Sequence, residues 1–350
     1  MNYLFLHCRG GFEKECAAEI ADLAAELGVY GYSKTKDGSA YVVFITHEPN
    51  GAMRVHQELQ FRKLVFTRQW FVTQEMLTGL PVADRVSPLL ATAANLPQAR
   101  ELLLETVDTN EGKELSGLSK KFTAPFSNAL RKNKLLSTKS PWRLHLVFIS
   151  GTEAYLGISL YANSSPWPMG IARLRLPREA PSRATLKLEE AWHHFIPAAD
   201  WDSRLASGMR AVDLGAAPGG WTWQLVQRGM YVEAVDNGPM DKKLLETGQV
   251  LHILTDGFLY EPKKKVDWLV CDIVDKPARV TSMIIRWFGK GYCREAIFNL
   301  KLPMKQRYLE VKKCEERILK ELGSLGFDAE VQFKQLYHDR EEVTGHLRVF

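Results

Sequence analysis

The sequence predicts an α/β protein with a mostly parallel sheet in its carboxyl-terminal half and a smaller α+β region before it. Short apolar runs alternate with helical patterns from residue 209 onward, which is the order that a parallel sheet requires. The first of these runs, within AVDLGAAPGGWT at 211–222, leads through a glycine-rich turn into a helix. In the first 75 residues, strand and helix patterns follow each other closely, which favours a compact α+β layer structure there.

Length and composition are those of an ordinary globular protein. The chain has 350 residues, enough for two domains, of which 45% are hydrophobic and 25% charged. A net charge of +5 permits a nucleic-acid partner without requiring one. Five cysteines without a C-x-x-C spacing favour reduced thiols, so neither a zinc site nor another metal is expected. No apolar run has the length of a membrane span and no signal peptide is recognisable, so we expect a cytoplasmic protein without a membrane partner.

The first 75 residues are expected to form one domain. Their apolar and helical spacings predict a β-α-β-α-β order, which is typical of a ferredoxin-like fold. The predicted strands are 3–8, 40–46 and 64–72, and the predicted helices are 12–27 and 50–59.

Residues 76–161 are expected to form a second small α/β domain with a basic surface. The stretch 113–143 holds eight basic residues against one acid, Glu114, and Phe122, Phe126 and Trp142 are interspersed among them. Positive charge beside aromatic rings suits an RNA surface, but a solvated helix face whose aromatics point into the core explains the pattern equally well. The predicted elements are strands at 101–108, 143–150 and 154–160 and a helical segment at 111–134. The residues expected to contact RNA are Lys120, Lys121, Arg131, Lys132 and Lys134.

Residues 162–183 contain four prolines and several arginines, which predicts an interdomain linker. The last domain is expected to span 184–350. Its first helix, 182–192, begins at Ser182 as the expected cap. The other predicted elements are strands at 230–235, 250–254, 266–271, 296–300, 327–333 and 343–350 and helices at 276–288 and 308–325.

The glycine-rich turn indicates a nucleotide-type cofactor site, because glycines let a ligand approach the backbone and a helix N-terminus offers free N–H groups. The turn fails the G-x-G-x-x-G fingerprint of dinucleotide binding, and Trp221 stands where a Walker loop needs lysine. Asp236, after the run 230–235, is placed to accept hydrogen bonds from ribose hydroxyls. Asp256, after the run 250–254, is placed to bind an adenine amino group.

Two charged residues, Asp272 and Lys301, stand at the carboxyl ends of predicted buried strands. Ligands bind at that edge of open α/β sheets, and partly desolvated charges there persist when they are paired or functional. Lys187 by itself is an ordinary helix lysine. The pair His193-His194 and the string Tyr337-His338-Asp339 are expected to be structural, because no third ligand is spaced for zinc.

The string DLGAAPGGWT resembles motif I of class I S-adenosylmethionine-dependent methyltransferases, and in particular that of the FtsJ-type ribose 2'-O-methyltransferases. The string S-R-x-x-x-K-L at 182–188 matches the helix that precedes motif I in that family. Ala184 departs from the family, in which a serine hydroxyl there would contact the cofactor. The resemblance implies S-adenosylmethionine as cofactor and a Lys-Asp-Lys-Glu tetrad at Lys187, Asp272, Lys301 and Glu342, with Glu341 as the alternative fourth member. The implied cofactor contacts are Gly215, Ala217, Pro218, Gly219, Gly220, Asp236, Asp256 and Asp272.

Methyl transfer to a ribose hydroxyl is an in-line displacement, and the hydroxyl needs a base to take its proton. Lys301 is the expected proton acceptor. A free lysine has a pKa of about 10.4 and is charged at neutral pH, so this role requires burial and the like charge of Lys187 to outweigh the carboxylates. If the carboxylates win, Lys301 instead orients the hydroxyl and stabilises the developing oxyanion.

The whole chain resembles the bacterial RlmM-type methyltransferases in the strings FNLKLPMK at 298–305 and HDREEVTGHLR at 338–348, and in the layout of a ferredoxin-like domain before a THUMP-like RNA-binding module. The resemblance implies 2'-O-methylation of a cytidine in 23S ribosomal RNA near the peptidyl transferase centre, before full ribosome assembly, by a monomer. One alternative is a base or protein methyltransferase, although the string CDIVDKP at 271–277 lacks the Asn/Asp-Pro-Pro-Tyr motif of base N-methylators. The other is a non-catalytic RNA-binding ribosome-assembly factor with a vestigial cofactor pocket.

Overall fold

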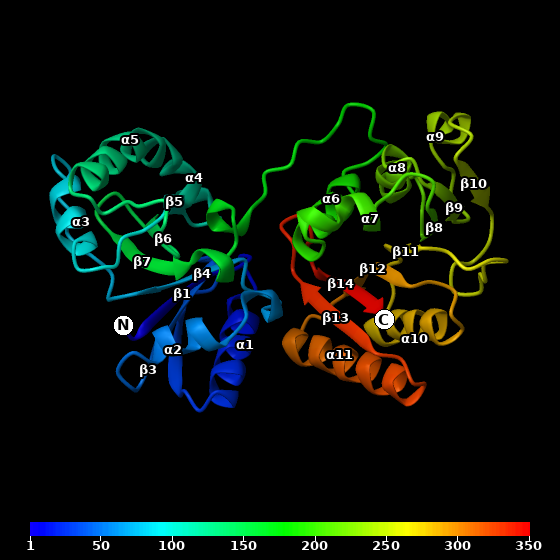
Figure 1. Cartoon of the computed structure of the whole chain (residues 1–350), viewed down its shortest axis with the longest axis horizontal. Coiled ribbons are helices and arrows are strands. Elements are labelled where there is room, and N and C mark those ends of the chain that lie inside the picture. The colour runs from blue at the N-terminus through cyan, green and yellow to red at the C-terminus, as the bar shows by residue number, and fades with distance from the viewer. The chain divides into compact units, whose positions relative to one another are not determined.

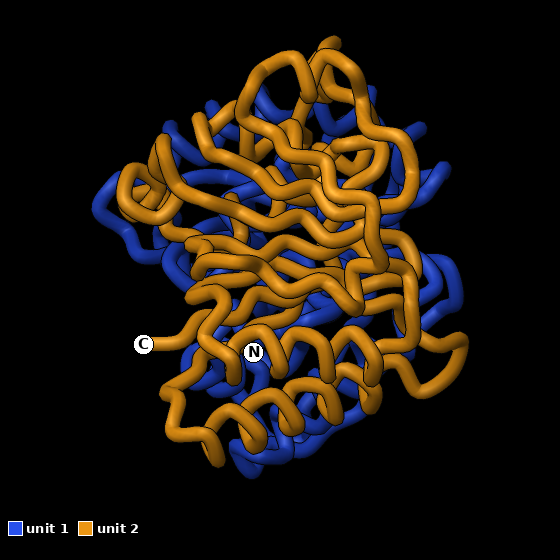
Figure 2. Tube along the Cα trace, turned by 90° about the vertical axis from the view of Figure 1, so that its right-hand side faces the viewer, with its two compact units in different colours: residues 1–172 blue, residues 173–350 orange.

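The computed structural model describes residues 1–350, and these form two compact units, Met1–Ala172 and Arg173–Phe350 (Figure 2). The boundary between the units falls inside the predicted linker, 162–183. No helix in the structure combines the length and the apolar character that crossing a bilayer would require.

The first unit contains seven strands and five α-helices, with three short 3-10 helices between them. Their bounds are β1 (Tyr3–His7), α1 (Glu13–Glu26), β2 (Gly31–Thr35), β3 (Tyr41–Thr46), α2 (Gly51–Glu58), η1 (Phe61–Lys63), β4 (Gln69–Thr73), α3 (Val86–Ala93), β5 (Leu102–Thr106), α4 (Asn110–Glu114), α5 (Ser116–Lys132), β6 (Trp142–Phe148), β7 (Ala154–Leu160), η2 (Tyr161–Asn163) and η3 (Pro168–Gly170).

The first unit is built on one sheet, in the order β2-β3-β1-β4-β7-β6-β5. Helices α1 and α2 pack against β1–β4, whereas α3 and α5 pack against β5–β7. The order β1-α1-β2-β3-α2-β4 confirms the ferredoxin-like prediction, with β2 as an additional strand. The sequence does not reveal β2 because its residues, GYSKT, are mostly polar and lie at the exposed edge of the sheet.

Antiparallel pairing of β4 with β7 joins the two amino-terminal segments in this one sheet, although the sequence predicts a domain boundary near residue 75. Gly157 permits the close pairing, because a Cβ atom at that position would lie 2.2 Å from the carbonyl oxygen of Val72. Strand β4 also begins later than predicted, at Gln69, because residues 64–68 after the short helix η1 form bends and not strand.

The second unit contains seven strands and six α-helices, with one 3-10 helix. Their bounds are α6 (Thr185–Phe195), η4 (Ala198–Asp200), α7 (Trp201–Arg204), β8 (Arg210–Leu214), α8 (Gly220–Gln227), β9 (Tyr231–Val235), α9 (Lys242–Glu246), β10 (Val250–Ile253), β11 (Trp268–Cys271), α10 (Pro277–Gly289), β12 (Glu295–Lys301), α11 (Arg307–Ser324), β13 (Ala329–Lys334) and β14 (Glu342–Val349).

The second sheet has the order β10-β9-β8-β11-β12-β14-β13, which confirms the predicted mostly parallel sheet. The first five strands in this order are parallel to one another, and β14 runs antiparallel to both of its neighbours. Helices α6 and α8 lie on one face of the sheet, and α10 and α11 lie on the other (Figure 1). The carboxyl ends of the parallel strands therefore share one open edge, where ligands bind in this architecture.

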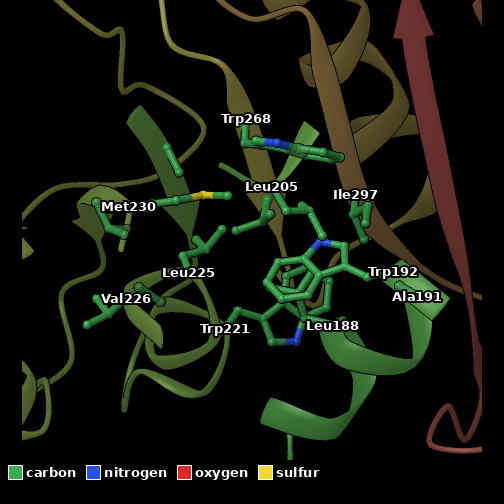
Figure 3. Close-up of a cluster of buried hydrophobic side chains, with 14 of the residues drawn as sticks. Leu188, Ala191, Trp192, Leu205, Trp221, Leu225, Val226, Met230, Trp268 and Ile297 are labelled. Carbon is green, nitrogen blue, oxygen red and sulfur yellow. The ribbon is translucent and has the colours of Figure 1, made fainter. Parts of the chain in front are cut away.

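A buried apolar cluster fixes helix α6 on this sheet. Leu188, Ala191 and Trp192 on α6 lie against Trp221 and Leu225 on α8 (Figure 3). The expected cap is wrong: the helix begins after Ala184, and the buried hydroxyl of Ser182 has no hydrogen-bond partner. Because the apolar side of α6 is anchored in this way, Lys187 is held at a defined position near the edge of the sheet.

Candidate active site

Four charged side chains meet at the carboxyl edge of the second sheet. The ammonium group of Lys187 lies 2.6 Å from Glu342 Oε1 and 3.5 Å from Asp272 Oδ1. The ammonium group of Lys301 lies 3.9 Å from Glu342 Oε2, so Glu342 faces both lysines with its two oxygens. The structure thus brings together the four residues of the predicted tetrad.

Strand register explains why residues so distant in sequence converge. Lys301 is the last residue of β12, and the antiparallel ladder places it directly opposite Glu342, the first residue of β14. Asp272 follows the last residue of β11, the parallel neighbour of β12 on its other side. Lys187 reaches the same edge from α6, and these contacts span 155 residues of chain.

The same register separates Glu342 from its neighbour Glu341. Side chains alternate between the faces of a strand, so the two carboxylates point in different directions. Glu341 is half exposed and accepts a hydrogen bond from Arg307 at 2.8 Å, whereas only 12% of the Glu342 side chain is exposed. Glu342 is therefore the member of the cluster.

Burial and pairing shift the pKa values of the central pair. Burial by itself would lower the pKa of Lys187, but the facing carboxylates of Asp272 and Glu342 outweigh it and raise the pKa above its ordinary value. Burial raises the pKa of Asp272, and the Lys187 ammonium and the Asn299 amide offset only part of this effect. Lys187 is thus a permanently charged residue at neutral pH.

A cleft of about 290 Å³ opens beside the cluster, at the ends of β8, β9, β10 and β11. Asp272 belongs to both the cleft and the cluster. Of the expected cofactor contacts, Gly215, Asp236, Asp256 and Asp272 line the cleft. Sequence reasoning missed the other residues of the lining, which are Val235, Asn237, Thr255, Gly257, Phe258, Ile273 and Val274.

The cleft fits an elongated nucleoside ligand such as S-adenosylmethionine. Gly215 and Gly257 keep it open, because a Cβ atom at either position would come within 2.8 or 2.9 Å of the Ile273 side chain. Carboxylates stand at the ends of three different strands and offer acceptors for hydroxyl and amino groups. The volume is near the lower end of the range for small-molecule sites.

The remaining expected cofactor contacts shape the turn and do not line the cleft. The backbone N–H of Ala217 donates to Asp236 Oδ2 at 3.0 Å, and the Ala217–Pro218 peptide bond is cis. Gly219 has a φ of 117°, which a residue with a side chain rarely adopts. A Cβ atom on Gly220 would lie 2.4 Å from the Ser182 hydroxyl, so this glycine lets the segment before α6 approach α8.

Three buried polar residues beneath the cluster were not expected to belong to the site. Asn299 donates to Asp272 Oδ1 at 2.7 Å, and Thr344 and Asp339 extend the contact inward. The sequence does mark two of these residues. Asn299 lies two residues before Lys301, and Thr344 lies two residues after Glu342, and residues two apart in a strand point to the same face of the sheet. Asp339 belongs to the string Tyr337-His338-Asp339, which was expected to be structural, and its neighbour His338 pairs with Glu190 at 2.6 Å.

No group of three or more His, Cys, Asp or Glu side chains is arranged to hold a metal ion.

The basic surface of the first unit is formed by exposed side chains on helix α5 and directly after it. The five side chains expected to contact RNA are all exposed, and Lys120, Lys121, Arg131 and Lys132 lie on α5. Of the two interpretations left open for the aromatic residues, the structure supports burial, because Phe122 and Phe126 stack on each other in the core and Trp142 packs partly buried against the same cluster. The two phenylalanines are therefore not available for base stacking, whereas the exposed basic side chains suit phosphate groups.

The fold, the glycine-rich turn and the charged edge define a methyltransferase of the FtsJ-like class, and the FtsJ-like methyltransferase family model matches residues 180–285. Models for the RlmM ferredoxin-like domain and for the N-terminal region of ribosomal RNA large subunit methyltransferase M match residues 1–71 and 84–160.

Proteins named ribosomal RNA large subunit methyltransferase M are similar to this chain over its full length. The protein from Cellvibrio japonicus is 73% identical over 350 residues, covering 100% of both chains. Those from Pseudomonas fluorescens and Stutzerimonas stutzeri are each 56% identical and cover 99% of this chain and 97% and 99% of their own. The chain therefore belongs to the family of ribosomal RNA large subunit methyltransferase M, and it is a methyltransferase. The THUMP-like character of residues 76–161 stays a prediction.

Asp213, in the strand before the glycine-rich turn, makes the free energy of unfolding depend on pH. Its side chain is buried, Thr222 donates to Oδ2 at 2.6 Å, and Oδ1 has no partner. Burial raises the pKa of Asp213 to about 7, so the folded protein retains a proton that the unfolded chain releases near pH 4. Between these values the free energy of unfolding falls as the pH rises, because the folded state binds more protons.

Replacing Asp213 by asparagine removes this ionisation. We expect Asp213→Asn to become more stable relative to the wild type between pH 5 and pH 7, by at most about 1.4 kcal/mol per pH unit, with a constant difference above pH 8. Urea unfolding at pH 5, 6, 7 and 8 measures the difference. The exposed Asp37→Asn serves as a charge-matched control, and parallel pH profiles for Asp213→Asn and the wild type would contradict the prediction.

Proposed function

We propose that this methyltransferase transfers the methyl group of S-adenosylmethionine to the ribose 2'-oxygen of a cytidine in 23S ribosomal RNA near the peptidyl transferase centre. The observation that carries this proposal is the cluster of Lys187, Asp272, Lys301 and Glu342, which adjoins the cleft through Asp272. The names of the relatives support large-subunit ribosomal RNA as the substrate.

The residues that would hold S-adenosylmethionine are those of the cleft, with Asp236 and Asp256 placed for ribose and adenine. When bound, this cofactor supplies an electrophilic methyl group on a sulfonium. Asp272, which lines the cleft, and its partner Lys187 would then lie beside the place where the ribose hydroxyl meets the methyl group. Their opposite charges compensate each other, so this edge of the cleft stays polar without repelling a cationic ligand.

Lys301 is the residue we assign to the hydroxyl proton. Lys187 is held by two carboxylates and keeps its charge, so it anchors the cluster and stabilises negative charge on the attacking oxygen. Lys301 has one longer contact, 3.9 Å to Glu342, and 44% of its side chain is exposed. Its side chain is therefore free to turn toward a hydroxyl that enters from solvent. In its neutral amine form Lys301 would accept the hydroxyl proton as the methyl group is transferred, whereas in its charged form it would orient the hydroxyl.

The decisive experiment incubates the protein with labelled S-adenosylmethionine and unmodified 23S RNA and maps the product by its resistance to alkaline cleavage. A ribose 2'-O-methyl group blocks cleavage at one position, so a single protected cytidine is expected. A label on a base would make the chain a base methyltransferase. Binding of S-adenosylmethionine by calorimetry without any transfer would favour the non-catalytic assembly factor.

Replacement of Lys301 separates chemistry from cofactor binding. We expect Lys301→Ala to lower kcat by about 10²- to 10⁴-fold, because the hydroxyl loses its proton acceptor, while the Kd for S-adenosylmethionine stays within about twofold. Lys313→Ala, which removes an exposed lysine on α11, is the control and should leave both values unchanged. Retained turnover in Lys301→Ala would remove this residue from the mechanism.

Lys301→Arg distinguishes the two possible roles of this side chain, because arginine keeps the charge but does not accept a proton at neutral pH. We expect it to be as inactive as Lys301→Ala. Substantial activity in the arginine variant would assign Lys301 the role of a charged orienting group.

The basic surface of the first unit predicts a salt effect. We expect a variant with alanine at Lys120, Lys121, Arg131 and Lys132 to bind 23S RNA fragments more weakly. Its slope of log K against log salt should become shallower by up to about 3.6, since each of the four lost phosphate contacts contributes roughly 0.7 to 0.9.

A control with the same change in net charge replaces four exposed lysines of the second unit, Lys263, Lys264, Lys265 and Lys313. It should change the slope much less. Equal slopes for the two variants in filter binding between 50 and 200 mM salt would show that the basic surface of the first unit does not contact RNA.

A further inference from the structure

A chain of hydrogen bonds runs from the interior of the second unit to the tetrad. Thr344 Oγ1 lies 2.8 Å from Asn299 Oδ1, and the Asn299 amide donates to Asp272 Oδ1 at 2.7 Å. At the inner end, the two carboxyl oxygens of Asp339 lie 3.1 and 3.0 Å from Thr344 Oγ1. Asn299, Thr344 and Asp339 are at most 3% exposed, so none of them meets solvent or substrate directly.

Three neighbouring strands build this chain. Asn299 and Thr344 are directly opposite in the β12–β14 ladder, two residues along from the pair of Lys301 and Glu342. Asp272 continues β11 one residue beyond Cys271, which pairs with Phe298, and so it stands beside Asn299. The chain therefore lies in a row across the sheet, immediately beneath the charged edge.

The number of available protons decides which group donates and which accepts in each hydrogen bond of this chain. The Thr344 hydroxyl has one proton and three acceptors within reach, namely Asn299 Oδ1 and the two oxygens of Asp339. Asp339 Oδ2 already accepts from the backbone N–H of Leu336 at 2.9 Å. Burial raises the pKa of Asp339 well above its ordinary range, and Lys187, Glu190 and Glu342 are the charged groups that face it.

A protonated Asp339 satisfies every group in the row. Its carboxyl donates to Thr344, Thr344 donates to the carbonyl oxygen of Asn299, and the amide of Asn299 donates to the ionised Asp272. This order fixes the orientation of the Asn299 amide, because its nitrogen must face Asp272. It also stabilises the charged form of Asp272, which Lys187 requires as a partner.

Glu190 on α6 holds the loop that carries Asp339. Its carboxylate accepts the backbone N–H groups of Tyr337 and His338 at 2.7 and 3.0 Å. Because Glu190 lies one helical turn after Lys187, the same helix positions the lysine and the inner end of the hydrogen-bond chain.

We propose that Asn299 and Thr344 are positioning residues for methyl transfer, and that the chain Asp339–Thr344–Asn299 holds the Asp272 carboxylate against Lys187 at the wall of the cofactor cleft. The proposal rests on the proposed function, since it assigns the tetrad to transfer. Without this hydrogen-bond chain, Asp272 rotates away from Lys187. The ribose then meets a disordered edge, although the RNA surface and the rest of the cleft lining remain in place.

The test compares Thr344→Val, which removes the hydroxyl at nearly constant volume, with Thr344→Ser, which keeps it. Thr344→Val should lower kcat by about 10- to 100-fold, while KM for RNA stays within about twofold. Thr344→Ser should recover kcat to within about threefold of the wild type. Thr73→Val in the first unit, whose buried hydroxyl donates to Leu156 at 2.7 Å, controls for a purely structural loss and should keep kcat.

A double variant tests whether the residues act in series. Thr344→Val added to Asn299→Leu should slow transfer no further than Asn299→Leu alone, because both changes break the same chain. Losses that multiply, or a Thr344→Val enzyme with wild-type kcat, would overturn the proposal. So would a Thr344→Ser enzyme no faster than Thr344→Val.

Crystal structures of the wild type and of Thr344→Val show the position of the Asp272 carboxylate independently of turnover. The proposal expects the contact between Asp272 and Lys187, 3.5 Å in the wild type, to open in the variant, and an unchanged carboxylate would overturn it. If the wild type labels a base or no RNA at all, the proposed function fails, whereas this structural comparison still decides whether the chain holds Asp272.

Discussion

The antiparallel pairing of β12 with β14 is the constraint on which the site depends. It places Lys301 opposite Glu342 at the open edge of the sheet, where the antiparallel strand β14 follows the five parallel strands. A shift of one residue in this register would turn Glu342 toward the other face of the sheet. Glu342 would then no longer meet Lys301, and Lys187 would lose its shortest contact.

Charge compensation explains why this edge tolerates partly buried ions. Lys187 and Lys301 supply two positive charges, and Asp272 and Glu342 supply two negative ones, so the cluster is neutral as a whole. A buried charge is costly unless it is paired, and here each carboxylate has an ammonium or amide partner. Lys187 is the less exposed lysine and is held by two carboxylates, whereas Lys301 is more exposed and can move. This difference suits a reaction in which one lysine anchors the site and the other turns toward the substrate.

Sequence patterns were sufficient for the order of the strands in the second unit, but they did not reveal the short helices α7 and α9. The strand ends mark Asp272 and Lys301, whereas Lys187 and Glu342 follow only from the resemblance to the FtsJ-type family. Sequence patterns were insufficient where tertiary pairing decides. The polar strand β2 and the joining of β4 to β7 have no local signal, since edge exposure and the close approach at Gly157 arise only in the assembled sheet. The aromatic residues of α5 illustrate the same limit, because spacing alone does not reveal which face of a helix is buried.

A comparison of Glu342→Gln with Glu341→Gln isolates the role of the charged edge, because the two changes are chemically identical and only the strand register distinguishes them. The rate of methyl transfer to 23S RNA at saturating S-adenosylmethionine is the quantity to measure. We expect Glu342→Gln to lower this rate at least tenfold, since both lysines lose their shared carboxylate, and Glu341→Gln to leave it unchanged. Equal rates for the two variants would contradict the assignment of the charged edge as the centre of the reaction.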